Sequence, residues 1–436
     1  MTVCAIEPPS TGTSDTSGAP GASRTPGAGG TTGAGGCVPV AGCVLTADGA
    51  YAARLALDGD SWFPERWTLD GPEPYAVPLP GHQPEEPGTE VQPMGDGRVL
   101  IHRLVERRHA FALLYPTGPG TGELPLGAVE CPEPGTRLTL LPPAPGGARA
   151  YALTVGPRSS VVWLVAGGAS GPERLAEVPG LCSGGVWLDG AGRMLALDRE
   201  LGGRTKTVVV DLERGEVTPL LQIAEDSDDR LLLADRDSGL LLISSDAPSP
   251  GRPRVGWGVL GSTLPVRFPE CLRVPDCTVT PFAVQPEQML MPESCAVALR
   301  VDGAFGTWLG VWRPAERLMC HLPAPEGWLR GAGLLTRDGV LRLPYATGDV
   351  PCGVAELTAP RSGTRGRGAG AGQLEAADAA RPEGRAEVGP QGPVRDGAAA
   401  GPPGASRQAT ETDPPEPVAA RPVPLQQAPL GGLVTK

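Results

Sequence analysis

Histidine and cysteine are the side chains here best suited to metal or nucleophilic chemistry, and neither type forms a recognisable site. The chain has 436 residues with ten cysteines and only four histidines: His82, His102, His109 and His321. The pairs Cys37/Cys43 and Cys271/Cys277 have C-x5-C spacing, which is wider than the C-x2-C of a zinc knuckle. We therefore expect free, mostly buried thiols, with no metal site and no cofactor.

Two polar clusters each allow two interpretations. The acidic run Glu225–Asp229 could bind a cation, but it lacks the spacing and central glycine of an EF-hand loop, so a solvated loop between repeats is favoured. His102 and His109 flank Glu106 and two arginines. They could form a small anion site at a strand edge, although a surface pair on one hairpin is favoured.

The sequence lacks the motif of a serine-hydrolase nucleophile and that of a nucleotide-binding P-loop. The chain contains no G-x-S-x-G, because in Gly180–Gly184 the serine stands one place too late. Gly167–Gly171 is glycine-rich but lacks the Lys-Ser/Thr of a P-loop, and we interpret it as a hairpin loop. These motifs therefore assign no catalytic residue.

Net charge and hydropathy limit the classes of binding partner that the sequence favours. The formal net charge is −12, which favours neither nucleic acid nor an anionic membrane. No stretch is long and apolar enough for a membrane helix, and Met1–Ser10 lacks the basic and apolar regions of a signal peptide. We expect a cytoplasmic monomer that binds no nucleic acid and no membrane.

Composition divides the chain into three parts. Residues 1–36 and 360–436 are rich in Gly, Ala, Pro and polar residues without apolar periodicity, and we predict that both tails are disordered. Within the second tail, residues 373–380 could form a brief helix, and the more apolar residues 422–436 could be a docking peptide or a frayed end. Residues 37–359 form the folded body, with residues 37–40 as a possible latch strand.

The folded body shows a repeat of short strands separated by turn residues, which predicts an all-β structure. Asp-Gly or a similar turn recurs about every 45 to 50 residues, for example at Asp48-Gly49, Asp96-Gly97, Asp189-Gly190 and Asp338-Gly339; the sixth turn is degenerate, near Glu287. A proline-containing exit recurs in phase with these turns. The two markers predict a single β-propeller of about seven four-stranded blades, because stacking such sheets around an axis buries both faces of each.

The fourth unit carries a family resemblance. It runs Trp187-Leu188-Asp189-Gly190 through Leu197-Asp198, then Thr207-Val208-Val209-Val210-Asp211-Leu212, then Gly215-Glu216 and Val217–Leu220. This resembles the blades of TolB-like propellers and of the N-terminal propeller of prolyl-oligopeptidase-type enzymes. Those enzymes also carry a hydrolase domain with G-x-S-x-G, which this sequence lacks, so the resemblance implies the fold without the peptidase activity.

The innermost strand of each blade should lie just before each turn and place one residue per blade at the axial channel. These strands are predicted at residues 42–46, 89–92, 137–141, 184–188, 230–233, 278–282 and 331–335. Their only charged members are Glu90, Arg137 and Arg230, which we predict to be binding residues at the axial mouth. We therefore expect a non-catalytic scaffold for a protein or peptide partner. A lactonase- or lyase-type enzyme with its site at the channel is the alternative.

Overall fold

The computed structural model describes residues 42–118, 120–131, 133–289 and 291–360. These residues form 26 strands, and their only helical turns are two 3-10 segments, η1 (Glu270–Leu272) and η2 (Pro292–Ser294). The all-β prediction is confirmed. None of the described helices has the length and hydropathy needed to span a bilayer. The predicted latch at 37–40, the helix at 373–380, the segment 422–436 and both tails lie outside the described residues.

The strands form seven antiparallel sheets, which we number as blades 1 to 7 in chain order. Blade 1 contains β1 (Val44–Leu45), β2 (Tyr51–Asp58), β3 (Ser61–Thr68) and β4 (Tyr75–Pro78). Blade 2 contains β5 (Glu90–Pro93), β6 (Val99–Val105), β7 (Arg108–Pro116) and β8 (Thr121–Glu130). Blade 3 contains β9 (Arg137–Leu140), β10 (Ala150–Val155), β11 (Ser159–Ala166) and β12 (Glu173–Pro179). Blade 4 contains β13 (Leu181–Trp187), β14 (Met194–Leu201), β15 (Arg204–Asp211) and β16 (Glu216–Pro219).

The remaining blades follow the same up-and-down order. Blade 5 contains β17 (Asp229–Ala234), β18 (Leu240–Ser245) and β19 (Arg254–Val259). Blade 6 contains β20 (Cys277–Val284), β21 (Val297–Gly303), β22 (Gly306–Trp312) and β23 (Cys320–Leu322). Blade 7 contains β24 (Leu334–Leu335), β25 (Val340–Tyr345) and β26 (Gly353–Thr358). Where blade 5 would have a fourth strand, a single bridge joins Trp257 to Arg267. Pro265 and Pro269 flank this bridge and have no N–H to extend a ladder.

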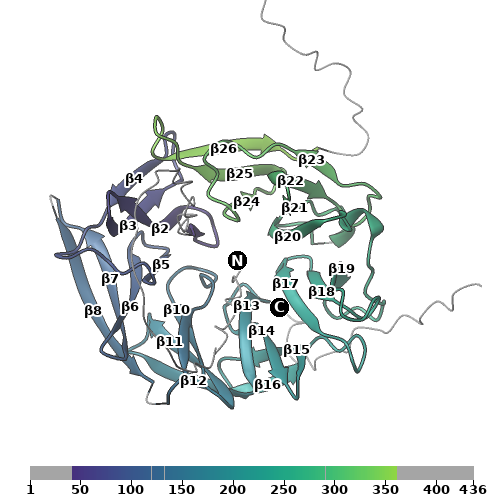
Figure 1. Cartoon of the computed structure of the whole chain (residues 1–436), viewed down its shortest axis with the longest axis horizontal. Helices are drawn as coiled ribbons and strands as arrows, with labels where there is room; N and C mark the ends of the chain where they lie inside the picture. Colours follow the sequence, from purple (N-terminus) through teal and green to yellow (C-terminus); the bar gives the residue numbers. More distant parts are fainter. Residues whose placement is uncertain (1–41, 119, 132, 290, 361–436) are drawn as a thin grey trace, which may run out of the picture. The chain divides into compact units, whose positions relative to one another are not determined.

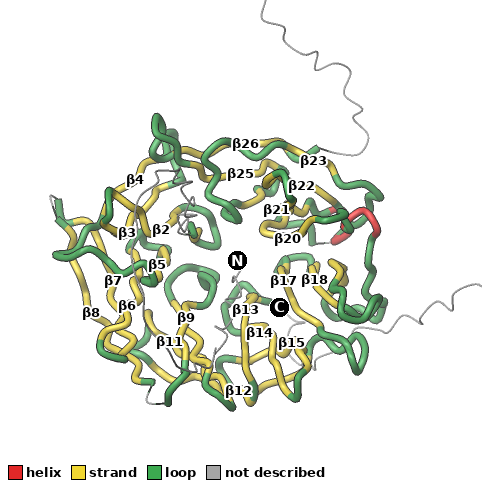
Figure 2. The backbone as a smooth tube through the Cα atoms, in the orientation of Figure 1, coloured by secondary structure: helices red, strands yellow, loops and turns green. Residues whose placement is uncertain are grey.

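The blades are arranged around a central axis, with the first strand of each blade innermost (Figures 1 and 2). First strands of neighbouring blades contact one another, as in β1–β5, β13–β17, β17–β20 and β20–β24. Each of the seven predicted inner segments overlaps one of these strands, so the seven-bladed propeller is confirmed. Because every blade repeats the same strand order, all the inner strands begin at the same end of the ring.

The Asp-Gly turns and the proline-containing exits have the local geometry expected from the sequence. At Asp96-Gly97, Gly97 has φ 82° and the Asp96 carboxylate accepts the Arg98 amide at 3.0 Å, so the pair forms a tight turn. Pro78, Pro179 and Pro219 are the last residues of the outer strands β4, β12 and β16. Proline is tolerated there because an edge strand has one side without ladder partners.

The core is divided into seven apolar clusters, one between each pair of neighbouring blades. Trp187 packs between blades 3 and 4, Trp257 and Trp312 between blades 5 and 6, and Trp328 between blades 6 and 7. Large aromatic rings therefore fill much of the space between these blades.

Blades 1 and 7 close the ring. Trp67 and Leu69 of blade 1 pack with Leu329 and Ala332 of blade 7, and Arg342 donates a hydrogen bond to the Leu69 carbonyl at 3.0 Å. At Gly49, φ is 73° and a Cβ would lie 2.0 Å from Leu334 Cδ2. Glycine at this turn therefore permits the close approach of blades 1 and 7.

Candidate functional site

All three residues predicted at the axial mouth lie where the inner strands begin. We define the axial mouth as this end of the channel. Glu90 and Arg137 are the first residues of β5 and β9, and Arg230 is the second residue of β17. The structure does not bring the three side chains together. Glu90 and Arg230 belong to separate polar clusters, whereas Arg137 is exposed and forms no hydrogen bond or ion pair with the described side chains.

Glu90 anchors a buried chain of two imidazoles between blades 2 and 3. Glu90 Oε2 lies 2.9 Å from His102 Nδ1 and accepts the Leu140 amide of β9 at 3.0 Å. His102 Nε2 lies 2.9 Å from His109 Nδ1. When His102 donates from Nδ1 to the Glu90 carboxylate, its neutral ring can accept a hydrogen bond from His109.

The structure corrects the interpretation of His102 and His109 as a surface pair. His102 and His109 are 5% and 7% exposed, and His102 stacks on Phe111 with ring centroids 5.2 Å apart. Burial, with a further contribution from His102, lowers the pKa of His109. The cluster links the two blades because Glu90, which is held by His102, accepts the Leu140 amide of blade 3.

Arg230 belongs to a second cluster, where β17 of blade 5 meets blade 4. Its Nη1 lies 3.3 Å from Ser183 Oγ and 3.9 Å from Asp198 Oδ2, and its Nη2 donates to Thr205 Oγ1 at 3.2 Å. The Arg230 side chain is 44% exposed, whereas that of Asp198 is 9% exposed. Arg230 therefore presents a partly solvated guanidinium beside a nearly buried carboxyl group.

Asp198 is held in a fixed orientation. Its Oδ1 accepts hydrogen bonds from Thr207 Oγ at 2.8 Å and from the Leu231 amide at 3.0 Å. Burial raises the pKa of Asp198 to about 6, although these hydrogen bonds and Arg230 act in the opposite direction. The carboxyl group can therefore change its protonation state near neutral pH.

A glycine bulge in β13 exposes the inner strand beside Asp198. The register between β13 and β14 shifts between Ser183 and Val186, and Gly184 and Gly185 have φ of 74° and 140°. A Cβ on Gly184 would lie 3.4 Å from Asp198 Oδ2, so this oxygen faces the bulge. Ser183 and Gly184 are exposed. The bulge therefore opens a polar surface at the axial mouth.

Asp229 lies next to Arg230 but has a different role. It is 0% exposed and accepts hydrogen bonds from Lys206 Nζ at 2.8 Å, the Ile223 amide at 2.9 Å, and the hydroxyls of Ser227 and Ser245 at 2.9 and 2.6 Å. The interpretation of the run 225–229 as a solvated loop is therefore wrong for its last residue. Asp229 instead joins blades 4 and 5 through a fully bonded carboxylate.

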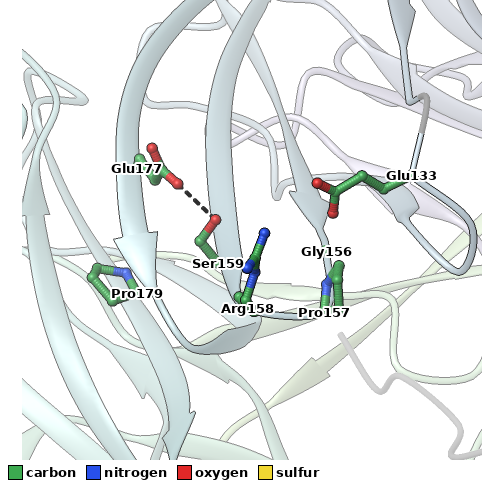
Figure 3. A pocket seen from close by; sticks show the side chains of 7 residues that line it. All are labelled: Glu133, Gly156, Pro157, Arg158, Ser159, Glu177 and Pro179. Atoms are coloured by element: carbon green, nitrogen blue, oxygen red, sulfur yellow. Dashed lines mark hydrogen bonds between the residues drawn. The ribbon is translucent and has the colours of Figure 1, made fainter.

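A pocket at the same end of the ring is formed by blade 3 and the segment before it (Figure 3). It is lined by Glu133, Gly156, Pro157, Arg158, Ser159, Glu177 and Pro179. Ser159 donates to Glu177 at 2.6 Å, and Glu177 also pairs with Arg174. These contacts lower the pKa of Glu177, which remains an ionised, solvated carboxylate. The inner strand β9 does not line this pocket.

The thiols of the described residues are free and poorly suited to nucleophilic chemistry. Cys182 and Cys295 are buried, and the other six are partly buried. Burial raises the pKa of Cys43 to about 12 and that of Cys182 to about 11, so both remain protonated at neutral pH. Within the described part of the chain, no group of three or more His, Cys, Asp or Glu side chains is placed to hold a metal ion.

Sequence reasoning identified Arg230 and missed its partners Ser183, Asp198 and Thr205. A clue was available in Gly184-Gly185, because paired glycines inside a strand pattern mark a bulge or a close backbone approach. Asp198 gave a weaker clue as an acidic residue at the end of an apolar strand run, Met194–Leu197.

Comparison with known proteins yields structural similarities only. No family model and no curated protein sequence matches the chain. TolB from Acinetobacter baumannii is 12% identical, with a TM-score of 0.40 over 65% of this chain and 63% of its own. An oligogalacturonate lyase from Vibrio parahaemolyticus is 12% identical, with a TM-score of 0.47 over 74% of this chain and 93% of its own.

Prolyl oligopeptidase B from Galerina marginata is 11% identical, with a TM-score of 0.41 over 72% of this chain and 45% of its own. The chain thus spans less than two thirds of TolB and less than half of this oligopeptidase. TolB and the oligopeptidases are the groups that the blade pattern resembled. The described residues contain no hydrolase domain.

Proposed function

We propose that this propeller is a non-catalytic scaffold that binds a protein or peptide partner at the axial mouth. The main support is the hydrogen-bonding capacity that the ring leaves unused there. Arg230 is partly exposed beside Asp198 Oδ2, which accepts no hydrogen bond from the described residues, and the bulge at Gly184 exposes the neighbouring strand. Exposed Arg137 adds a cation that has no partner among the described side chains.

The loops around this end of the ring also suit a protein partner. Exposed apolar side chains lie in or directly before the turns between second and third strands, namely Leu57, Leu104, Leu201, Phe305 and Val350. These turns lie at the same end as the starts of the inner strands, because the second strand of each blade runs back toward that end. Arginine and aromatic residues such as Phe305 are enriched at protein interfaces.

Selection of random displayed peptides on the full-length protein tests this function. Dissociation constants of the selected peptides should rise about fivefold to tenfold in R137A or R230A, because an arginine contact contributes about 1 kcal/mol. The matched control is R236A, an exposed arginine at the turn that begins the second strand of blade 5, at the other end of the ring. Failure to select any binder, or binding unaffected by both mouth variants, would contradict the proposal.

A second candidate function is an enzyme with its site at the axial channel, of the lactonase or lyase type. The observation that favours it is Asp198, whose pKa is raised to about 6 beside Arg230, since such a group can exchange protons near neutral pH. Lactone hydrolysis and β-elimination from uronate oligosaccharides should be measured for the wild type and D198N. Turnover that D198N abolishes would favour the enzyme.

A further inference from the structure

Arg230 and Asp198 place a hydrogen-bond donor and an unused acceptor side by side at the axial mouth. Arg230 Nη1 and Asp198 Oδ2 are 3.9 Å apart, which is too far for a hydrogen bond between them. Both hydrogen bonds that Asp198 accepts from the described residues go to Oδ1. Asp198 Oδ2 instead faces the exposed bulge at Gly184, so it is accessible to a donor from a ligand.

Neighbouring groups hold this pair in place. Thr207 Oγ and the Leu231 amide fix the plane of the Asp198 carboxyl group through Oδ1. Ser183 Oγ and Thr205 Oγ1 lie 3.3 and 3.2 Å from the two terminal nitrogens of Arg230. Because both side chains are already oriented, a ligand would lose little free energy in ordering them.

The charges of the pair select the kind of ligand. The carboxylate and the guanidinium cancel, so neither an anion nor a cation gains from the pair as a whole. A complementary group must be neutral and must present an acceptor and a donor on one side. A primary carboxamide does so within one planar group. The N–H and C=O of a trans peptide unit point in opposite directions, and those of a single backbone residue share one side only when that residue is extended.

We propose that the cluster Ser183–Asp198–Arg230 is a subsite for a primary carboxamide of the kind carried by Asn and Gln side chains. The carboxamide oxygen accepts from Arg230, and its N–H donates to Asp198 Oδ2. This inference rests on the proposed function, since the carboxamide belongs to a peptide partner, and it specifies which side chain the mouth selects.

Protonation of Asp198 should change this selectivity. Burial raises the pKa of Asp198 to about 6, so the carboxylate accepts a hydrogen bond at pH 7.5. Below pH 6 it is mainly protonated and can donate, which favours a carboxylate ligand instead. Arg230 on β17 is the ionisable side chain that acts on Asp198, and it lowers the pKa of that carboxyl group. The Cys182 thiol on β13 also lies near Asp198, but burial raises its pKa to about 11, so it stays neutral.

The experiment compares N-acetylglutamine N-methylamide with its glutamate analogue in NMR titrations of the full-length protein at pH 7.5. We expect the glutamine compound to bind at least about fivefold more tightly, because the glutamate carboxylate meets the Asp198 carboxylate. R230A should weaken the binding of both compounds about fivefold to tenfold, and the control R236A should change neither.

D198N provides a test that loss of folding cannot imitate. Thr207 and Leu231 donate to the Oδ1 position, so the new amide oxygen must occupy that position and the NH2 group must replace Oδ2. The acceptor thus becomes a donor, and we expect the preference to reverse, with the glutamate compound binding about fivefold more tightly. Equal binding of the two compounds by the wild type, or an unchanged preference in D198N, would overturn the proposal.

The outcomes also separate this subsite from the scaffold function. Displayed peptides that bind the mouth without any preference for Gln or Asn would leave the scaffold standing and remove the carboxamide subsite. A reversal of preference in D198N, together with failure to select any peptide binder, would establish the subsite and remove the peptide scaffold.

Discussion

The junction between blades 2 and 3 and the junction between blades 4 and 5 both contain buried polar side chains, but the hydrogen bonds of these side chains are satisfied to different extents. Both carry a polar cluster that links an inner strand to the neighbouring blade. At the first, Glu90 is bonded to both His102 and the Leu140 amide of blade 3. At the second, Asp229 is fully bonded, whereas Asp198 keeps one oxygen without a donor. Unused hydrogen-bonding capacity, rather than charge alone, therefore distinguishes a candidate binding surface from a structural joint.

The largest effect is expected at Asp229. D229A leaves Lys206 without its carboxylate partner and removes the acceptor for Ile223, Ser227 and Ser245, so the free energy of unfolding should fall by about 3–5 kcal/mol. Urea denaturation followed by tryptophan fluorescence measures it. The control D226A removes an exposed carboxylate of the same loop and should cost little. A loss below about 1 kcal/mol in D229A would contradict the structural role.

The next effect is the pH dependence that Asp198 introduces. Its pKa in the folded state, about 6, lies above the ordinary 3.8, so the folded protein keeps the proton longer than the unfolded chain does. The resulting stabilisation is fully present below the ordinary pKa and is lost as pH rises through 6. The free energy of unfolding, compared with D198N, should fall by up to about 3 kcal/mol between pH 4 and pH 7. The exposed control D60N should follow the wild type; a flat difference for D198N would refute the prediction.

A smaller loss is expected at the junction between blades 2 and 3. E90Q keeps the size of the side chain but replaces charge-assisted hydrogen bonds with neutral ones, so the free energy of unfolding should fall by about 1–2 kcal/mol. Thermal denaturation at pH 7.5 can compare E90Q with E86Q, which alters an exposed glutamate nearby. Equal melting temperatures for the two variants would show that Glu90 does not stabilise the joint.

The smallest expected effect has the opposite pH dependence to that of Asp198. Because burial lowers the pKa of His109, its contribution is present above the ordinary pKa of 6.5 and is lost as pH falls below it. The difference in unfolding free energy between the wild type and H109Q should therefore shrink from pH 7.5 to pH 5.5. H82Q, at an exposed histidine, is the control. A difference that grows on acidification would mean that His109 is charged in the folded protein.

The sequence predicted the repeat well and the polar clusters poorly. Turn and exit residues are local features, so Asp96-Gly97 and Pro179 could be interpreted without knowing their neighbours. The pairing of His102 with His109 depends on the intervening turn, where Glu106 and Arg107 have φ of 49° and 72°. Nothing in Glu-Arg-Arg indicates a turn with two positive φ values, which usually contains Asn or Gly. Asp198 and Arg230 meet only because two blades pack together, and no local pattern records that contact.

The close approach of Gly49 to Leu334 also bears on the kinetics of folding. Arg342 and the Leu69 carbonyl are 273 positions apart, so joining blades 1 and 7 requires contacts between distant parts of the chain. The entropy of closing a loop grows only logarithmically, and a tenfold longer loop costs about 2 kcal/mol more. Contacts of such high order nevertheless slow the search. We therefore expect the junction of blades 1 and 7 to be among the last to form, with the facing surfaces of both blades solvated until it does.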